Sequence, residues 1–162
     1  MRPIVLCAAA LLSLASATKS AYRAPDAPAP SGVSDADLYA ATIRVFTDRG
    51  FGLRDKDVDA GMVSTEFVQV DNTLGFITLH SWRAVIAEGT LRLAIDCEMH
   101  HEGRIDGCGE SRVDDWIKTE PVLRQEIFDE AERRAKSRAH AAAPLETTPS
   151  ETADAGADKP SS

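Results

Sequence analysis

The sequence predicts a two-layer α+β domain with an N-terminal helix, a four- to five-stranded antiparallel meander sheet and a long C-terminal helix. Three patterns predict it: apolar residues at helical spacing in 35–49, alternating apolar and polar residues in 91–100, and a second helical stripe after Pro121. Because these patterns follow one another in the order helix, strands, helix, we expect both helices to cover one face of a single sheet.

The first helix is predicted over Asp35–Arg49. Ser34 is suited to the N-cap position, and Asp35 and Asp37 stand in the first turn, where the positive end of the helix dipole favours them. Gly50 follows as the C-cap residue. The apolar stripe, which another element must cover, consists of Leu38, Tyr39, Ala41, Ile43, Val45 and Phe46.

Three strands are predicted to follow this helix. Phe51–Asp57 is the first strand, and a turn joins it to the second, Met62–Val70. The alternation in the second strand is only approximate, which indicates a bulge. Asp71-Asn72 is a turn signal, and Leu74–Ile86 is the third strand.

The clearest alternation in the chain identifies a half-buried strand and its hairpin partner. Glu102-Gly103 forms the tight turn, and Arg104–Val113 returns as the partner strand. The apolar face of the first strand consists of Leu91, Leu93, Ile95, Cys97 and Met99, and its polar face of Arg92, Asp96, Glu98 and His100.

The same hairpin brings Cys97 opposite Cys108. A two-residue turn pairs residue 101 with residue 104, and therefore 97 with 108, at a hydrogen-bonded position where Cα atoms lie ~5.5 Å apart. A disulfide accommodates that distance, and we expect the bond to stabilise the domain by roughly 3 kcal/mol. This register places Ile105 on the polar face, so we also expect a bulge near Gly107 or Gly109.

The two ends of the chain differ in composition from the domain between them. Residues 1–17 are typical of a secretory signal peptide, with a positive charge, an apolar run of about a dozen residues and small residues before a cleavage point after Ala17. The run is shorter than the ~20 residues of a membrane-spanning helix, so we expect no stable membrane span. Residues 18–33 and 141–162 are predicted to be a disordered linker and a disordered tail around a domain of residues 34–140.

The cysteine count indicates the compartment. Cleavage would remove Cys7 and leave an even number of cysteines, which is typical of a protein in an oxidising compartment. We therefore expect a periplasmic or secreted protein.

The last helix is predicted to begin at Thr119, with Pro121 in its first turn, and to run to about His140. Basic residues between Arg133 and Arg138 follow acidic first turns, an order that complements the helix dipole. We interpret them as helix-stabilising. The net charge of −8 at pH 7 also opposes binding to nucleic acid, so no nucleic-acid partner is expected.

The polar face of the alternating strand is the candidate functional surface. Arg92, Asp96, Glu98 and His100 would lie together on the side of the sheet opposite the helices. We interpret these four residues as a possible partner-binding face.

A metal or small-ligand site is the alternative, near Trp82 or near His100-His101. Cys97, His100, His101 and Cys108 are residue types that bind zinc or copper. However, Cys97 and His100 point to opposite faces of one strand, and the thiols are expected in a disulfide. We therefore predict no metal site and no cofactor.

A catalytic group is not expected either. His80 and His140 have no acidic or thiol companion at a catalytic spacing, and no serine lies in a nucleophile-elbow pattern. We expect both histidines to be solvated. Trp82 is expected in the core, and Trp116 is expected to join the last helix to the sheet.

The segment from Ala36 to Thr65 carries the helix, Gly50-Phe51-Gly52 and the turn Asp59-Ala60-Gly61 before a strand. It resembles the small α+β domains of exported bacterial lipoproteins, including helix-grip domains of outer-membrane assembly accessory proteins. The resemblance implies a scaffold role without catalytic residues. The chain departs from the pattern because no lipidation site precedes a mature cysteine. An antiparallel sheet with a long helix also resembles cystatin-like and nuclear-transport-factor-like folds, which implies a ligand cavity.

These observations favour an exported, non-enzymatic envelope protein. We expect a monomer that acts as a docking or scaffold domain for another envelope protein and contacts it through the polar face of the sheet. A small-ligand or metal-binding module is the alternative function.

Overall fold

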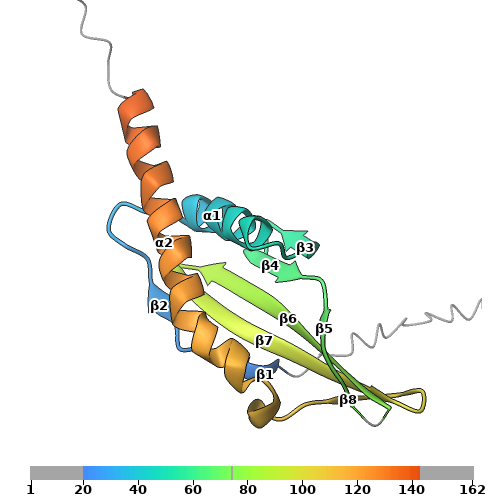
Figure 1. Ribbon diagram of the computed structural model, residues 1–162. Helices are drawn as coiled ribbons and strands as arrows, with labels where there is room; N and C mark the ends of the chain where they lie inside the picture. Colours follow the sequence, from blue (N-terminus) through green and yellow to red (C-terminus); the bar gives the residue numbers. More distant parts are fainter. Residues whose placement is uncertain (1–19, 74, 143–162) are drawn as a thin grey trace, which may run out of the picture.

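The computed structural model describes residues 20–73 and 75–142. The predicted signal peptide, residues 18–19 of the predicted linker and residues 143–162 of the predicted tail lie outside the described residues. The predicted α+β class is confirmed, with one early helix, a long C-terminal helix and an antiparallel sheet (Figure 1). The sheet has eight strands rather than four or five. In chain order the elements are β1 (Ser20–Arg23), β2 (Ala27–Pro28), α1 (Asp35–Asp48), β3 (Leu53–Asp57), β4 (Met62–Thr65), β5 (Val68–Thr73), β6 (Phe76–Ala87), β7 (Thr90–His101), β8 (Arg104–Gly107), the short 3₁₀ helix η1 (Glu110–Arg112) and α2 (Asp114–Ala142).

The long hairpin of β6 and β7 is the spine of the sheet. The two strands pair without interruption from Ala87 and Thr90 beside the turn to Ile77 and His100 at the far end. Strands β4 and β3 continue the sheet beyond β6, and β1 and β2 lie along the opposite edge, on β7. At the far end of the spine β5 pairs with β6 and β8 pairs with β7. This four-stranded far end extends past both helices (Figure 1).

Both helices pack on one face of the sheet and form the core with it. The N-cap predicted at Ser34 is confirmed, and the structure adds a capping box, because the Ser34 hydroxyl accepts a hydrogen bond from the Asp37 amide and the Asp37 carboxylate accepts one from the Ser34 amide. The largest fully buried side chains come from both layers: Trp82, Phe46, Leu38, Leu91, Leu93, Ile95 and Ile127. Burying them supplies the main driving force for folding.

The prediction of a disordered linker over residues 18–33 is wrong for its described part. Strands β1 and β2 add to the free edge of β7, and the chain between them follows the same edge because the Ala24 amide donates to the Leu93 carbonyl at 2.8 Å. Ala24 and Ala27 are 2% and 6% exposed. Small residues contribute little apolar area, so this segment is held mainly by backbone hydrogen bonds, which composition does not reveal.

Two other boundaries differ from the prediction. The predicted strand Met62–Val70 is divided into β4 and β5, and Asp71-Asn72 lies inside β5 instead of forming a turn. The expected irregularity is confirmed, since the register of β5 on β6 shifts between Gln69 and Asp71. The Glu66 amide, between β4 and β5, donates to the Gly52 carbonyl at 2.7 Å, which continues the pairing of β3 with β4 by one more residue pair.

Helix α2 begins five residues earlier than predicted. The Thr119 hydroxyl donates to the Trp116 carbonyl at 2.7 Å, which is the behaviour of a threonine inside a helix and not of an N-cap. Pro121 therefore lies within α2. The partner strand of the hairpin is also shorter than predicted, because β8 ends at Gly107 and η1 follows.

Candidate functional site

The Cys97–Cys108 disulfide is confirmed. Residues 98–101 of β7 pair with 107–104 of β8 in the predicted register, and the Cys108 amide donates to the Cys97 carbonyl at 3.4 Å. The Cα atoms of the two cysteines are 5.4 Å apart. The bulge expected near Gly107 is absent from the β7–β8 ladder. Ile105 accordingly stays on the polar face, where it is 63% exposed.

The four residues of the predicted partner-binding face share one side of β7 but do not form one open surface. Arg92 forms an ion pair with Asp26, which lies in the segment between β1 and β2. Asp96 is 1% exposed, so its assignment to a binding face is wrong. The physical reason is β1, whose Ser20 pairs with Asp96 and extends the sheet over this edge.

Asp96 belongs to a buried polar cluster instead. Its carboxylate accepts a hydrogen bond from the Arg83 guanidinium at 3.0 Å, and Arg83 also donates to the Ser20 hydroxyl. The second carboxylate oxygen of Asp96 and the hydroxyl of Ser81, its partner on β6, have no hydrogen-bond partner. A charge this deeply buried is stable only while its partner remains, so the cluster has a structural role.

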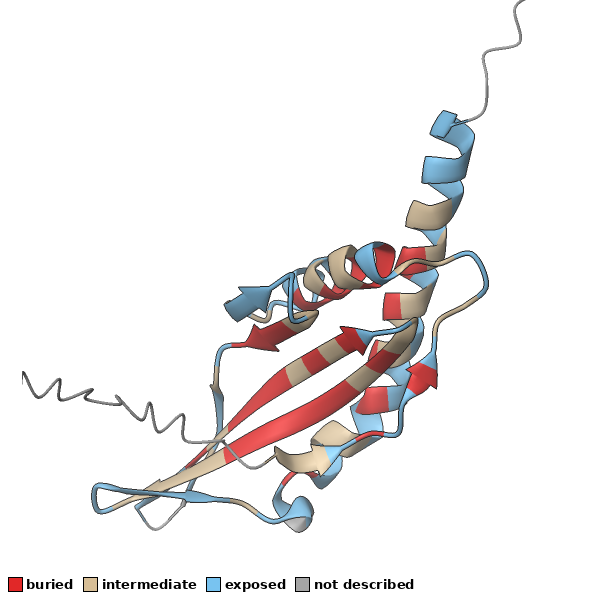
Figure 2. Cartoon of the chain, turned by 180° about the vertical axis from the view of Figure 1, so that it is seen from behind, coloured by how far each residue is buried: buried red, intermediate tan, exposed pale blue. Residues whose placement is uncertain are grey.

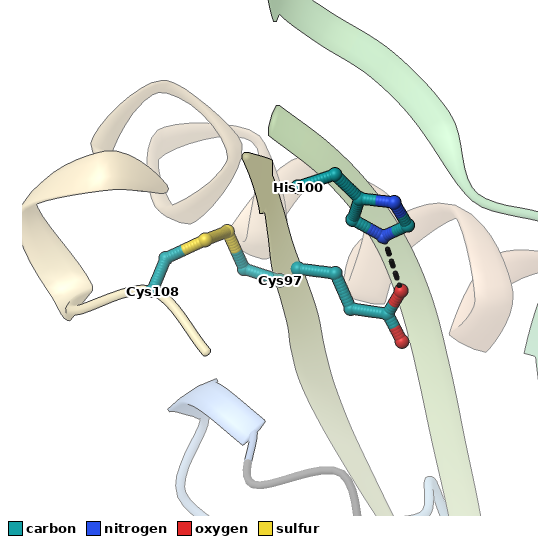
Figure 3. The surroundings of a disulfide bond; sticks show 4 residues. Cys97, His100 and Cys108 are labelled. Carbon is teal, nitrogen blue, oxygen red and sulfur yellow. Dashed lines mark hydrogen bonds and ion pairs between the residues drawn. A yellow bond between two sulfur atoms is a disulfide. The ribbon is translucent and has the colours of Figure 1, made fainter. Parts of the chain in front are cut away.

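Glu98 and His100 remain accessible at the far end of the sheet. The His100 Nε2 and the Glu98 carboxylate lie 3.0 Å apart, and their side chains are 35% and 21% exposed. Figure 3 shows that His100 lies on the opposite side of β7 from the disulfide. Cys97 and His100 are therefore separated by the sheet, which argues against a shared metal ion.

Aliphatic side chains surround this polar pair. Ile77 on β6, His100 on β7 and Ile105 on β8 form one row across three strands, and Leu79 lies opposite Glu98 in the next row. Figure 2 shows that exposure increases toward this end of the sheet, away from the buried centre of β6 and β7. We call the surface formed by Ile77, Leu79, Glu98, His100 and Ile105 the distal patch.

The opposite face of the same strands carries His80, a residue predicted to be solvated. This prediction is wrong, because His80 is 2% exposed and its ring contacts Trp116 edge-on at 5.1 Å between centroids. Burial lowers the pKa of His80. The alternation of β6 could have revealed this burial, because His80 lies on the same side of the strand as Trp82 and Ala84. His140 is exposed, as predicted.

Trp116 joins α2 to the sheet, as predicted, although it lies inside the helix. Its indole stacks on Trp82 with ring centroids 5.5 Å apart and contacts Phe51 at 6.0 Å. His101, on the helix-facing side of β7, stacks on Phe76 at 3.9 Å. The predicted neighbours His100 and His101 consequently point to opposite faces and do not share a site.

Comparisons with known proteins give no assignment. No protein-family model matches the chain, and no curated protein matches it. One similar solved structure is a TBP-like protein from Parabacteroides distasonis, with 9% identity, a TM-score of 0.44 and coverage of 68% of this chain and 91% of that chain. Another is a DUF4468 family protein from Bacteroides ovatus, with 13% identity, a TM-score of 0.37 and coverage of 79% and 88%. Neither similarity is strong enough to transfer a function, and neither description mentions a lipoprotein or a helix-grip domain.

Proposed function

We propose that this protein is an exported, non-enzymatic docking domain that binds another envelope protein through the distal patch. The observation that carries the proposal is the row of Ile77, His100 and Ile105 on a part of the sheet that extends past both helices. Ile105 is 63% exposed and Ile77 is 36% exposed. Neighbouring apolar side chains left in water, with a polar pair beside them, are typical of a protein-binding surface.

The edge strand β8 supplies a way to bind. All four of its residues are exposed, and within the described residues its outer edge pairs with no further strand. A free edge can accept an extended segment through backbone hydrogen bonds. A partner strand along β8 would place its side chains against Ile105, which would give the contact its specificity.

Export is part of the proposal. A disulfide between Cys97 and Cys108 persists in the periplasm or outside the cell, whereas the cytosol keeps thiols reduced. Among the residues that the structure describes, no helix has the length and apolar character needed to cross a membrane. The signal-peptide pattern of residues 1–17 is the sequence feature that would direct the chain to export.

A binding role is favoured over catalysis by the setting of the polar pair. Glu98 and His100 lie on the open surface of a sheet, between aliphatic side chains. Acid-base chemistry gains most from a cleft that excludes water and concentrates the field of its charges. The open distal patch supports recognition of a surface instead.

The experiment that tests this proposal uses a photo-crosslinking amino acid at position 105 in cells that produce the full chain. Position 122 on α2 is the matched control, because Val122 is also exposed, at 54%, and lies outside the distal patch. We expect one discrete adduct of the exported protein from position 105 and none from position 122. In addition, Ile77→Lys should remove the adduct from position 105, while the melting temperature stays unchanged.

Two results would contradict the proposal. Equal cross-linking from positions 105 and 122 would show that the adduct reflects general exposure. An adduct that persists unchanged in Ile77→Lys would show that the partner does not contact the distal patch.

A further inference from the structure

Strand β8 leaves one edge of the sheet open. Its residues Arg104–Gly107 are exposed, and within the described residues only β7 pairs with it. Apart from chain neighbours, no heavy atom lies within 4 Å of the position that a Cβ would take on Gly103 or Gly107, so side chains cover neither end of the strand. This part of the sheet extends past both helices (Figure 1). A further strand can therefore reach the edge of β8 without meeting α1 or α2.

The hydrogen-bond pattern of the hairpin determines which backbone groups face this open edge. Cys97 and Cys108 occupy a hydrogen-bonded position, because the Cys108 amide donates to the Cys97 carbonyl. Hydrogen-bonded and non-hydrogen-bonded pairs alternate along an antiparallel ladder. Ile105, three positions before Cys108, is therefore in a non-hydrogen-bonded pair with His100. The amide and carbonyl of Ile105 consequently point away from β7, toward the open edge.

The side chains of β8 alternate between the two faces of the sheet. Ile105 lies on the face of the distal patch, and Arg104 and Asp106 lie on the opposite face. Both charged side chains are exposed, and within the part of the chain that the structure describes neither forms an ion pair or a side-chain hydrogen bond. An unpaired cation and an unpaired anion therefore flank the residue whose backbone groups face outward.

This short sequence is complementary to itself in one antiparallel register. When Ile105 pairs with Ile105 of a second copy, the two residues exchange backbone hydrogen bonds, and each Arg104 lies opposite Asp106 of the other copy. The flanking pairs are then of the non-hydrogen-bonded kind, in which side chains approach most closely. The two adjacent registers that also use the outward-facing backbone groups place Arg104 opposite Arg104, or Asp106 opposite Asp106. Like charges directly opposite one another are destabilising, so charge favours the first register.

The same register joins the two distal patches. Both Ile105 side chains lie on one face at the centre of the contact, and they continue the row that Ile77, His100 and Ile105 form in each copy. Ile105 is 63% exposed in the single chain, so pairing removes apolar surface from water. However, the edge is short and the net charge of −8 opposes association. We expect a dissociation constant on the order of 10⁻⁴ M, which leaves the dilute protein monomeric.

We propose that two copies of this chain pair through β8 in this register and form one continuous sheet across the dimer. Pairing of two copies does not depend on the proposed function, because it requires no other protein. Where both hold, an envelope partner and a second copy exclude one another, since they use the same edge. The mass of the adduct cross-linked from position 105 separates the two, because only a second copy gives twice the mass of the chain.

The test uses sedimentation equilibrium of the purified, oxidised protein at pH 7, from about 10 µM to about 1 mM. Salt at about 0.15 M screens the net charge beyond ~8 Å. We expect an equilibrium between monomer and dimer, and the signal of the Ile105 amide in ¹⁵N-labelled protein should shift with protein concentration. A protein that stays monomeric up to about 1 mM would overturn the proposal without affecting the proposed function.

Charge reversal tests the register. Arg104→Asp places carboxylates opposite one another in both flanking pairs, and Asp106→Arg places guanidinium groups there, so each variant alone should dimerise about tenfold or more weakly than the wild type. An equimolar mixture of the two variants should recover the wild-type affinity, because every flanking pair then has opposite charges. The double variant Arg104→Asp/Asp106→Arg should recover it as well. Asp59→Arg, at an exposed residue of the turn between β3 and β4, is the control for net charge and should not weaken the dimer.

Two results with these variants would contradict the proposed register. If either single variant dimerised as tightly as the wild type, Arg104 and Asp106 would not lie opposite one another. If the mixture failed to recover the affinity, the two copies would associate through another surface. The substituted side chains are exposed, and recovery in the mixture would also show that both variants are folded.

Discussion

Replacing His80 by leucine should make the stability of the domain less sensitive to acid. Burial lowers the pKa of His80 in the folded chain, whereas in the unfolded chain the imidazole has its ordinary pKa of about 6.5. Above that pH neither state binds the proton, so the contribution of His80 to the free energy of unfolding is constant. As the pH falls below it, the unfolded chain takes up a proton that the folded chain resists, and the free energy of unfolding decreases.

The size of this effect follows from the titration of one group. The slope is at most about 1.4 kcal/mol per pH unit, so the wild type should lose up to ~2 kcal/mol between pH 6.5 and pH 5 through His80 alone. The charged groups that line the cavity beside His80 are Asp71, Arg112, Asp114 and Asp115. They are present in both proteins, as are the other histidines, so their contributions cancel in the difference between wild type and variant.

At pH 7 the variant should be at least as stable as the wild type. Removing two unpaired buried nitrogens favours leucine by about 1–3 kcal/mol. Losing the edge-on contact between His80 and Trp116 costs about 0.5–1.5 kcal/mol.

The assay is urea unfolding of both proteins between pH 5 and pH 8. We expect the two stability curves to be parallel above pH 6.5 and to diverge below it, with the variant retaining more stability. Curves that stay parallel over the whole range would refute this account of His80. If the free energy of unfolding of the variant at pH 7 were several kcal/mol below that of the wild type, the ring nitrogens would make stabilising contacts.

Three further predictions concern stability and are all measured by urea unfolding at pH 7. The double variant Cys97→Ala/Cys108→Ala should have a free energy of unfolding roughly 3 kcal/mol below that of the wild type. A decrease of less than about 1 kcal/mol would mean that the hairpin persists in the unfolded chain. Arg83→Ala should cost about 3–5 kcal/mol because it leaves the buried Asp96 carboxylate without its cation, whereas Arg83→Met/Asp96→Leu should recover part of that loss. If the double variant were less stable than Arg83→Ala, the ion pair would not explain the loss. Ser34→Ala should cost about 1 kcal/mol by removing the N-cap of α1, and an unchanged midpoint would show that water replaces the cap.

The sequence was sufficient to predict those parts of the fold whose geometry depends on neighbouring residues. The turn at Glu102-Gly103 and the period-2 alternation fix the register of the last hairpin, and with it the pairing of Cys97 with Cys108. Likewise, Ser34 is an N-cap because its neighbours supply the amide groups that it binds. These features depend on residues within about a dozen positions of one another.

Features that depend on distant segments were not predictable in the same way. Asp96 is buried because β1, more than seventy residues earlier, adds to the edge of β7. His80 is buried against Trp116, which comes from another element. Thr119 has the residue type of an N-cap, but packing of Trp116 on Trp82 extends the helix past it toward the N-terminus. Of the candidate site, Glu98 and His100 were identified, while the aliphatic residues around them were not, because only the sheet assembles them.

The disulfide has a further consequence for the distal patch. Cys97 and Cys108 close a covalent ring that contains Glu98, His100 and Ile105, three of the five residues of that surface. If the distal patch binds a partner as we propose, that partner meets a loop whose shape is already restricted, and the loop loses less conformational entropy on binding. Reduction would open the ring, so the proposed binding would be tightest in the oxidised form. A chain with reduced thiols would present the same side chains on a less restricted hairpin, and the proposed docking domain would then reach its full affinity only in an oxidising compartment.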